Sequence, residues 1–336
     1  MDLSVIILAA GKGTRMCSPQ PKVLQQFGGI SLLKRTVSTV RALYPQQILL
    51  VHGHGQRPLF EGELGSFGEG IGWVSQVQPL GTGHAVSMAL PYLALKTQYV
   101  LILYADMPLI SNMTLVNLLA GMSDKALHCV TGQADNPEGL GRVLRDSQGR
   151  VQAIVEHRDA DPNTQAIHEI NAGIYCVPKD FLCEAVVNIH ADNRQNEYYL
   201  TDIIALAVEK GLSIKTVLPQ HPSEILGVNT FRQLTALERS YQQDLARHWL
   251  DKGVHIIDPA RFDIRGEVAD IVIAPGVRID LNVILEGKIT HSGTPRQTSF
   301  RPNTCKGTHT CFHPNLCAFN QAVCQDHCAR ANGSVL

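Results

Sequence analysis

The chain has 336 residues, which is enough for one large α/β domain and a smaller second unit. Its 29 Lys and Arg residues nearly balance its 30 Asp and Glu residues, and this balance argues against nucleic acid or a membrane surface as a partner. There is no apolar run of about 18 residues, and residues 1–8 lack the basic start and long apolar core of a signal peptide. We therefore expect a cytoplasmic enzyme.

Short apolar segments alternate with amphipathic ones up to residue 177. The predicted strands are residues 5–8, 47–51, 72–75, 100–104, 128–132, 151–156 and 174–177. The predicted helices are residues 32–44, 83–90 and 114–122. This alternation predicts a doubly wound, mostly parallel α/β sheet with crossover helices. Ligands of such sheets bind at the carboxyl ends of the strands, so the residues that follow each strand are candidates for the functional site.

The first strand opens into a glycine-containing loop within VIILAAGKGTRMCSPQPKVL, residues 5–24. Gly11 and Gly13 allow backbone N–H groups to approach a ligand closely, and Lys12, Arg15 and Lys22 add positive charge. This combination suits a polyphosphate. The alternative is an ordinary strand, turn and helix start with surface cations.

Asp106 directly follows the apolar strand at residues 100–104, within LILYADMPLI. A carboxylate there would face the same crevice as the glycine loop, and Mg²⁺ binds one or two carboxylates together with phosphate oxygens of a substrate. Asp106 is therefore a candidate magnesium ligand. The alternative is a helix N-cap or a turn aspartate before Pro108.

Polar groups suited to a nucleobase follow the strand at residues 72–75, within QVQPLGTGHAV (76–86). Gly81, Thr82 and Gly83 open a helix whose free N–H groups can bind an anion or the edge of a base. Gln76 carries a donor and acceptors, as reading a uracil-type edge requires. A helix N-terminus capped by Thr82 without any ligand is the alternative.

Three further polar or glycine positions lie near the ends of later strands: Gly141, Glu156 and Asn171. A carboxylate and an amide can hold sugar hydroxyls and an acetamido group. Equally, these residues can be ordinary turn and edge-strand positions, and local sequence does not choose between the two.

The chain has nine cysteines, but only Cys17, Cys129, Cys176 and Cys183 lie in its first 300 residues. We expect these four to be free, buried thiols in a reducing compartment.

The pattern changes beyond residue 230. Residues 231–252 form a helical pattern with Leu234, Leu237, Tyr241 and Leu245 on one face, which predicts an arm between two domains. After it, Val277, Val283 and Ile289 recur at intervals of six residues, as in the coils of a parallel β-helix. The pattern lasts about two coils.

Several of these segments together resemble one enzyme family. They are LAAGKGTRMCSPQPKVL, LGTGHA, LYADMPLI, IVEHRDA, EINAGIY, NEYYLTDII, GVNTFRQL and DPARFDIRG, and they occur in this order. The chain resembles the bacterial bifunctional N-acetylglucosamine-1-phosphate uridylyltransferase/glucosamine-1-phosphate acetyltransferase family (GlmU) over about residues 3–288. The resemblance implies a Rossmann-like nucleotide-diphospho-sugar transferase domain at residues 1–229, a linker helix at 230–252 and the start of a left-handed β-helix at 253–289.

The resemblance also implies a reaction in which UTP and N-acetylglucosamine 1-phosphate give UDP-N-acetylglucosamine, a precursor of peptidoglycan and lipopolysaccharide, and pyrophosphate. Arg15 and Lys22 match the positions that neutralise phosphate charge. Asp106 and Asn229 match the pair that binds Mg²⁺. The positions that bind the nucleotide and the sugar match Leu8, Ala9, Ala10, Gly11, Lys22, Gln76, Gly81, Thr82, Tyr104, Gly141, Glu156, Asn171 and Asn229.

Residues 290–336 depart from the family pattern. They contain Cys305, Cys311, Cys317, Cys324 and Cys328, almost no acidic residues and no six-residue aliphatic repeat. One hypothesis for this segment is a zinc site that also uses His309, His313 and His327, but it has no CxxC pair and its cysteine spacings fit no common structural zinc pattern. We interpret the segment instead as the product of a reading-frame change near residue 289. We accordingly expect no acetyltransferase activity and no family-type homotrimer.

Two other functions remain open from the sequence. One is a nucleotidyltransferase that takes another sugar 1-phosphate. The other is a non-catalytic protein that only binds sugar nucleotides, which the presence of Arg15, Lys22, Asp106 and Asn229 argues against.

Overall fold

The structure is a computed structural model that describes residues 2–11, 13–291, 299–300, 305–306 and 309–311. The chain divides into two compact units. The first comprises residues 1–25 and 31–231, and the second comprises residues 26–30 and 232–336. The short segment 26–30 thus belongs with the second unit, which the sequence pattern did not indicate.

The first unit is built on a sheet of nine strands, described here for the residues that the structure covers. The main path runs in the order β11-β7-β10-β6-β1-β4-β5, and β8 and β9 attach beside β10. The bounds are β1 Leu3–Leu8, β4 Gln47–Gly53, β5 Ile71–Gln76, β6 Tyr99–Tyr104, β7 Ala126–Gln133, β8 Arg142–Arg145, β9 Val151–Val155, β10 Glu169–Pro178 and β11 Ser213–Val217.

The sheet is mostly parallel, as predicted. Strand β1 pairs in parallel with β4 and β6, β4 pairs in parallel with β5, and β7 pairs in parallel with β11. Strand β10 runs antiparallel to β6, β7 and β8. The carboxyl ends of β1, β4, β5 and β6 therefore meet at one edge of the sheet.

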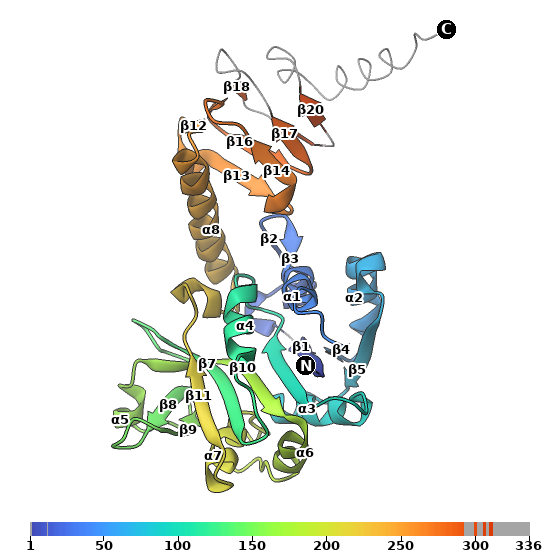
Figure 1. Ribbon diagram of the computed structural model, residues 1–336, viewed down its shortest axis with the longest axis vertical. Coiled ribbons are helices and arrows are strands. Elements are labelled where there is room, and N and C mark those ends of the chain that lie inside the picture. Colours follow the sequence, from blue (N-terminus) through green and yellow to red (C-terminus); the bar gives the residue numbers. More distant parts are fainter. Residues whose placement is uncertain (1, 12, 292–298, 301–304, 307–308, 312–336) are drawn as a thin grey trace. The chain divides into compact units, whose positions relative to one another are not determined.

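Helices cover both faces of this sheet, as Figure 1 shows. Alternate strand residues point to opposite faces: Ile6 and Leu8 pack with helices α3, α6 and α7, whereas Val5 and Ile7 pack with α1, α2 and α4. The helices are α1 Leu32–Arg41, α2 Arg57–Leu64, α3 Thr82–Ala89, α4 Asn112–Leu119, α6 Lys179–Val187 and α7 Asp202–Glu209, with a single turn α5 at Pro162–Gln165. The result is a three-layer α/β/α unit.

Several elements were not predicted from the sequence. Helix α2 contains Pro58 and Gly62, which are poor helix residues, and only Phe60 and Leu64 of it are buried. Helix α7 is apolar nearly throughout, so its sequence lacks the polar face that marks a surface helix. Tertiary packing, rather than local pattern, determines both helices.

The expectation for the cysteines is partly wrong. Cys129 and Cys176 are buried in the sheet, but Cys17 is exposed and Cys183 is half-buried. All four are free thiols. Cys17 lies in the loop after β1 rather than in an apolar strand, which explains its exposure.

The second unit combines helix α8, Phe231–Asp251, with short strands. Leu234, Leu237, Ala246 and Trp249 are buried on one face of the helix. The hairpin strands β2 Gln26–Phe27 and β3 Ile30–Ser31 lie at the segment 26–30, where the Phe27 and Tyr241 rings are 5.1 Å apart. Gly28 N–H also donates to the Glu238 carboxylate (3.2 Å).

Short parallel strands in three sheets follow α8. Their orders are β12-β15-β18, β13-β16-β19 and β14-β17-β20. The bounds are β12 His255–Ile256, β13 Phe262–Arg265, β14 Ile271–Ile273, β15 Arg278–Ile279, β16 Val283–Glu286, β17 Ile289–His291, β18 Ser299–Phe300, β19 Cys305–Lys306 and β20 His309–Cys311.

Stacked coils of a three-sided parallel β-helix have this arrangement, and Val277, Val283 and Ile289 are buried inside it. Strand pairing extends past residue 289, because Ile289 of β17 pairs with His309 of β20. The remaining residues to which the frame-change and zinc hypotheses refer lie outside the described residues.

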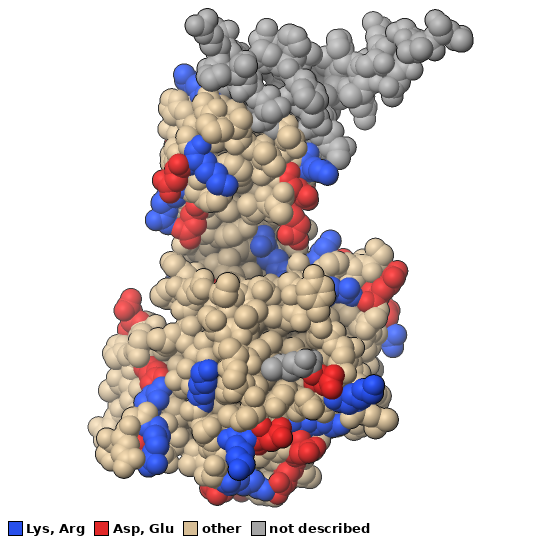
Figure 2. Space-filling view, in the orientation of Figure 1, with Lys and Arg blue, Asp and Glu red and all other residues tan. Residues whose placement is uncertain are grey.

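Two surface properties agree with the composition. No helix in the described part of the chain is both long and apolar enough to cross a membrane. On the face shown in Figure 2, Lys and Arg residues lie among Asp and Glu residues instead of forming a patch of one sign.

The packing in the first unit can be tested by replacing leucine with alanine at one buried and at one exposed position. Leu50 in β4 is fully buried, whereas Leu95 is 97% exposed. Leu50→Ala should lower the free energy of unfolding by about 3 kcal/mol, because it leaves a cavity in the core. Leu95→Ala should change it by less than about 0.5 kcal/mol. Urea unfolding of both variants measures the difference, and equal losses would contradict this packing.

Candidate active site

The loop after β1 is held between the two neighbouring strands. Ala9 N–H donates to the Val51 carbonyl (2.9 Å), and Ala105 N–H donates to the Leu8 carbonyl (3.1 Å). Leu8, Ala9 and Ala10 are buried, whereas Gly11 is exposed and a Cβ there would meet nothing within 4 Å. The backbone therefore reaches the surface at Gly11 from a rigid base. Lys12, a predicted source of charge, lies outside the described residues.

Two cationic and two oxygen-bearing side chains converge beyond this loop. Arg15 lies in the 3₁₀ turn Thr14–Met16, and Lys22 begins the 3₁₀ turn Lys22–Leu24. The Lys22 ammonium forms an ion pair with the Asp106 carboxylate and donates to Asn229 Oδ1 (3.0 Å). Arg15 Nη2 also donates to Asn229 Oδ1 (3.0 Å). The structure thus brings together all four residues that the resemblance assigned to phosphate and metal.

This cluster is shielded from water in part. The Lys22 and Asp106 side chains are only 13% and 18% exposed. Water screens an ion pair less when the pair is partly buried, so these charges act strongly on a ligand that enters between them.

The donor atoms fit a hard divalent cation. Asp106 and Asn229 supply a carboxylate and an amide oxygen that both lie within hydrogen-bonding distance of one cationic atom, Lys22 Nζ. Mg²⁺ prefers such oxygen ligands and completes its shell with water and phosphate oxygens. No group of three or more His, Cys, Asp or Glu side chains suited to a metal occurs among the described residues, so this two-ligand arrangement differs from an all-protein metal cage.

Two interactions hold Asn229 beside Asp106. Val228 N–H donates to the Asp106 carbonyl (2.9 Å), which joins the two loops directly. In addition, the buried Glu224 carboxylate accepts hydrogen bonds from Ser111 N–H (3.0 Å), the Thr114 hydroxyl (2.7 Å) and His221 N–H (3.0 Å). Glu224 therefore links the loop that carries Asn229 to the start of α4, just after Asp106. The sequence pattern did not identify this residue.

The orientation of the Gln76 amide is determined by its surroundings. Gln76 ends β5 and is buried, and its Nε2 lies 3.0 Å from the Gly81 carbonyl and 2.9 Å from His84 Nδ1. Because a carbonyl only accepts, the amide nitrogen must face Gly81, and His84 Nδ1 must accept as well. Burial lowers the pKa of His84, which favours the neutral ring that this requires.

Both amide hydrogens of Gln76 are thus used inside the protein. Within the described residues its Oε1 makes no hydrogen bond, so this oxygen is the atom left to accept one from a ligand. The sequence predicts that Gln76 offers a donor and acceptors to a base, whereas this geometry leaves Gln76 as an acceptor.

The start of α3 packs tightly against a distant loop. Gly81 has φ +112°, and a Cβ there would lie 2.5 Å from the Tyr198 carbonyl oxygen, so only glycine fits. Tyr198 N–H donates to the Leu80 carbonyl (2.9 Å), and Leu200 N–H donates to the Thr82 hydroxyl (3.0 Å). These contacts fix Gly81 and Thr82 beside Gln76.

The four residues assigned to the sugar form a second cluster. An ideal Cβ on Gly141 would lie 3.5 Å from Glu156 Oε2 and 3.6 Å from the Asn171 Cβ, and Asn171 N–H donates to the Gly141 carbonyl (2.9 Å). Tyr104 ends β6 and its ring lies against Gly173, where an ideal Cβ would be 2.2 Å from Tyr104 Cε2, so Tyr104 lies beside the strand segment that carries Asn171. Tyr104 and Asp106 flank the buried Ala105 in the chain. The sugar cluster is therefore adjacent to the phosphate cluster, which consists of Arg15, Lys22, Asp106 and Asn229.

Carboxyl groups at the edge of the sugar cluster repel one another. Burial, with the charges of Asp159, Asp202 and Glu197, raises the pKa of Glu156. Burial and the charge of Asp159 raise the pKa of Asp202 to about 6. The Thr201 hydroxyl donates to Glu156 Oε1 (3.4 Å) and partly offsets this effect.

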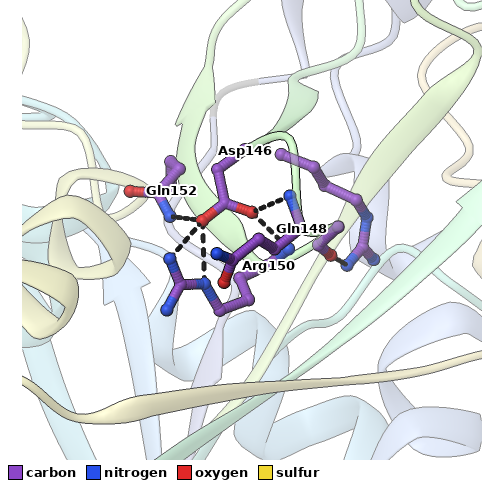
Figure 3. Close-up of polar contacts among 6 residues, drawn as sticks. Asp146, Gln148, Arg150 and Gln152 are labelled. Carbon is purple, nitrogen blue, oxygen red and sulfur yellow. Dashed lines mark hydrogen bonds and ion pairs between the residues drawn. The ribbon is translucent and has the colours of Figure 1, made fainter.

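A well-ordered hairpin supports Gly141 and Glu156, which lie just before β8 and just after β9. At the turn of the hairpin, the Asp146 carboxylate accepts hydrogen bonds from the backbone of Gln148 (2.9 Å) and Arg150 (2.9 Å) and from the Gln152 side chain (3.1 Å), as Figure 3 shows. The backbone N–H groups of Arg150 and Gln148, together with the Arg150 side chain, lower the pKa of Asp146. The turn fixes the β8–β9 register at the end away from the sugar cluster.

Comparison with known proteins places these features in context. Residues 5–256 match the MobA-like NTP transferase domain. The bifunctional protein GlmU of Stutzerimonas stutzeri (strain A1501) is 46% identical over 289 residues, which cover 86% of this chain and 62% of that protein. The bifunctional protein GlmU of Pseudomonas putida (strain GB-1) is 47% identical with the same coverage. The chain thus spans 62% of the length of these relatives.

A solved structure shares the fold. The crystal structure of UDP-glucose pyrophosphorylase complexed with UDP-glucose superposes with a TM-score of 0.59 and 17% sequence identity. The match covers 73% of this chain and 100% of the other. At this identity the likeness shows the fold alone.

The role of Glu224 in holding Asn229 can be tested through stability. Burial opposes ionisation of Glu224, but the hydrogen bonds from Thr114 and Ser111 outweigh it and lower the pKa. A lowered pKa in the folded state adds stability that is present above the ordinary glutamate pKa and is lost as the pH falls through the folded-state pKa. Glu224→Gln should therefore cost about 2 kcal/mol at pH 7, and the cost should shrink below about pH 4.

The matched control is Glu209→Gln, at an exposed position on α7. Thermal unfolding of both variants and the parent chain between pH 3 and pH 7 provides the measurement. A Glu224→Gln variant as stable as Glu209→Gln at pH 7 would show that the carboxylate does not anchor this loop.

Proposed function

The chain belongs to the family of MobA-like NTP transferase domains, and from this premise we propose that it transfers a uridylyl group from UTP to N-acetylglucosamine 1-phosphate. The products are UDP-N-acetylglucosamine and pyrophosphate. The observation that carries the proposal is the convergence of Arg15, Lys22, Asp106 and Asn229 beside the loop after β1. Similarity to the bifunctional GlmU proteins supports the choice of substrates.

In the proposed reaction, an oxygen of the sugar phosphate attacks the α-phosphorus of UTP and the bond to the β-phosphate oxygen breaks. No nucleophile from the protein is needed, so catalysis depends on positioning and on neutralising charge. Arg15 and Lys22 neutralise phosphate oxygens as negative charge moves to the departing pyrophosphate. The backbone at Leu8, Ala9, Ala10 and Gly11 holds the uridine side.

Asp106 and Asn229 would hold Mg²⁺. Bound there, the cation would neutralise phosphate charge and so lower the cost of bringing two anionic substrates together. Lys22 contacts both Asp106 and Asn229. Its ammonium is therefore also held where the substrate phosphates would approach these two side chains.

The sugar cluster supplies the acceptor site. Glu156 accepts hydrogen bonds from sugar hydroxyls, and Asn171 contacts the acetamido group. Tyr104, whose pKa is raised by burial, stays protonated and covers the junction between the sugar and the phosphates. The expected lack of acetyl transfer and of a trimer concerns residues that lie largely outside the described part of the chain, and both stay predictions.

The proposed reaction is tested by pyrophosphate release from UTP and N-acetylglucosamine 1-phosphate, with the sugar nucleotide identified by mass spectrometry. Asp106→Asn should lower kcat/KM by about 100-fold or more, because it removes the charged metal ligand. Chelation of Mg²⁺ should abolish release by the parent chain. The matched control is Asp124→Asn, at an exposed carboxylate that accepts a long hydrogen bond from Tyr99 (3.4 Å).

Two outcomes would contradict the proposed reaction. One is a folded parent chain that releases no pyrophosphate with this sugar phosphate. The other is an Asp106→Asn variant as active as Asp124→Asn.

The fixed orientation of Gln76 predicts a preference among nucleotides. Uracil presents an N–H at N3, which Gln76 Oε1 can accept, whereas cytosine presents a lone pair there. A site built to accept one hydrogen bond discriminates strongly against a partner that cannot donate it, so kcat/KM should favour UTP over CTP by about 100-fold or more. Competition between the two nucleotides measures this ratio. A ratio near one would mean that Gln76 does not read the base.

A further inference from the structure

Tyr175 is a polar residue in the middle of the core that the proposed reaction does not use. It lies in β10, is fully buried, and packs with apolar residues of the sheet. Its hydroxyl accepts a hydrogen bond from Asn171 Nδ2 (2.7 Å). A phenylalanine would fill this apolar site equally well, so the hydroxyl calls for an explanation beyond packing.

The strand is bulged between these two residues. Asn171 pairs with Thr131 of β7 and Tyr175 pairs with Cys129, so the three residues 172–174 oppose the single residue Val130. A bulge shortens the distance between side chains on its two sides and redirects them. It thereby brings the Tyr175 hydroxyl within reach of Asn171, four residues earlier.

Gly173 makes the bulge possible. Its φ is +72°, and a Cβ there would lie 2.2 Å from Tyr104 Cε2, so a side chain is excluded by both the backbone and the neighbouring ring. Gly173 N–H donates to Asn171 Oδ1 (3.0 Å). Because this N–H can only donate, it identifies the oxygen of the Asn171 amide and fixes the side chain in one orientation.

The two internal bonds leave a defined set of free groups on Asn171. One Nδ2 hydrogen goes to Tyr175, and one lone pair of Oδ1 accepts from Gly173. Among the described residues, one N–H and one oxygen lone pair of Asn171 remain for a ligand. An acetamido group carries a carbonyl that can accept from this N–H and an N–H that can donate to this lone pair, on two separate atoms, whereas a hydroxyl carries both functions on one oxygen.

We propose that Tyr175 is a positioning residue that makes the sugar site selective for an N-acetylated sugar, by holding the Asn171 amide through its buried hydroxyl. This inference rests on the proposed function and adds a residue to it. Burial raises the pKa of the Tyr175 phenol, and the charges of Tyr104, Cys129 and Glu156 raise it further, so the phenol stays protonated. It therefore acts as a neutral hydrogen-bond partner and takes no part in proton transfer.

The test is Tyr175→Phe, which removes only the hydroxyl. We expect KM for N-acetylglucosamine 1-phosphate to rise by about 5- to 10-fold, since one buried hydrogen bond is lost. The KM for UTP should stay within about twofold, because the nucleotide groups do not contact Tyr175. The preference for N-acetylglucosamine 1-phosphate over glucose 1-phosphate should fall by the same 5- to 10-fold factor.

A double-mutant cycle separates positioning from a general effect on structure. If Tyr175 acts through Asn171, adding Tyr175→Phe to an Asn171→Ala variant should change KM for the sugar by less than about twofold. The matched control is Tyr99→Phe, at the amino end of β6, whose hydroxyl contacts only Asp124 in the described residues (3.4 Å). Tyr175→Met, which also lacks the hydroxyl, serves as the second variant if the phenylalanine variant does not fold.

Three results would overturn the inference. They are an unchanged sugar preference in Tyr175→Phe, an equal rise in both KM values, or a full additional effect in the Asn171→Ala background. Calorimetric titration of the parent chain with UDP-N-acetylglucosamine distinguishes these from a failure of the proposed function. A parent chain that neither binds this product nor turns over would remove the proposed function and, with it, this inference.

Discussion

The ion pair between Lys22 and Asp106, with Asn229 as a shared neighbour, is the interaction on which the rest of the site depends. Lys22 thereby contacts Asp106, which lies 84 positions later in the chain, and Asn229, which lies 207 positions later. Lys22 comes from the loop after β1, Asp106 follows β6, and Asn229 follows the segment that Glu224 anchors. Parallel pairing of β1 with β6 places the first two at one edge of the sheet, and the hydrogen bond from Val228 to the Asp106 backbone adds the third.

The neighbouring clusters are built on the same principle, since each places a side chain amide in one orientation by internal hydrogen bonds. Gln76 donates both of its amide hydrogens, to Gly81 and to His84, and Asn171 donates one to Tyr175. An amide that is held in this way presents a fixed pattern of donors and acceptors, at no further entropic cost when a ligand binds. Under the proposed function, a few such groups would distinguish the base and the sugar, while the charged cluster between them would act on the phosphates, which all nucleotides and sugar phosphates share.

The sequence predicted most of the sheet and the phosphate cluster, because short apolar runs mark buried strands and the loop after the first of them carries the cations. Asp106 was also visible locally, as a carboxylate directly after a fully apolar strand. Asn229 was not, since no spacing rule relates it to Asp106, and only the family resemblance assigned it. Tyr175 was missed because a single polar residue in an apolar strand gives no sign of its partner. Glu224 was missed because a glutamate after the polar stretch QHPS resembles an ordinary surface residue. Gly173 did give a signal, since an isolated glycine in a strand pattern suggests a bulge, although its consequence for Asn171 required coordinates.

We propose that one site in the first unit holds the base, the phosphates and the sugar in a row along the sheet edge. A crystal structure of the chain with UDP-N-acetylglucosamine and Mg²⁺ tests this arrangement. We expect uracil beside Gln76, phosphates between Lys22 and Arg15, and the acetamido group on Asn171, all in one bound molecule. A sugar nucleotide bound elsewhere, or bound with its sugar away from Asn171, would contradict it.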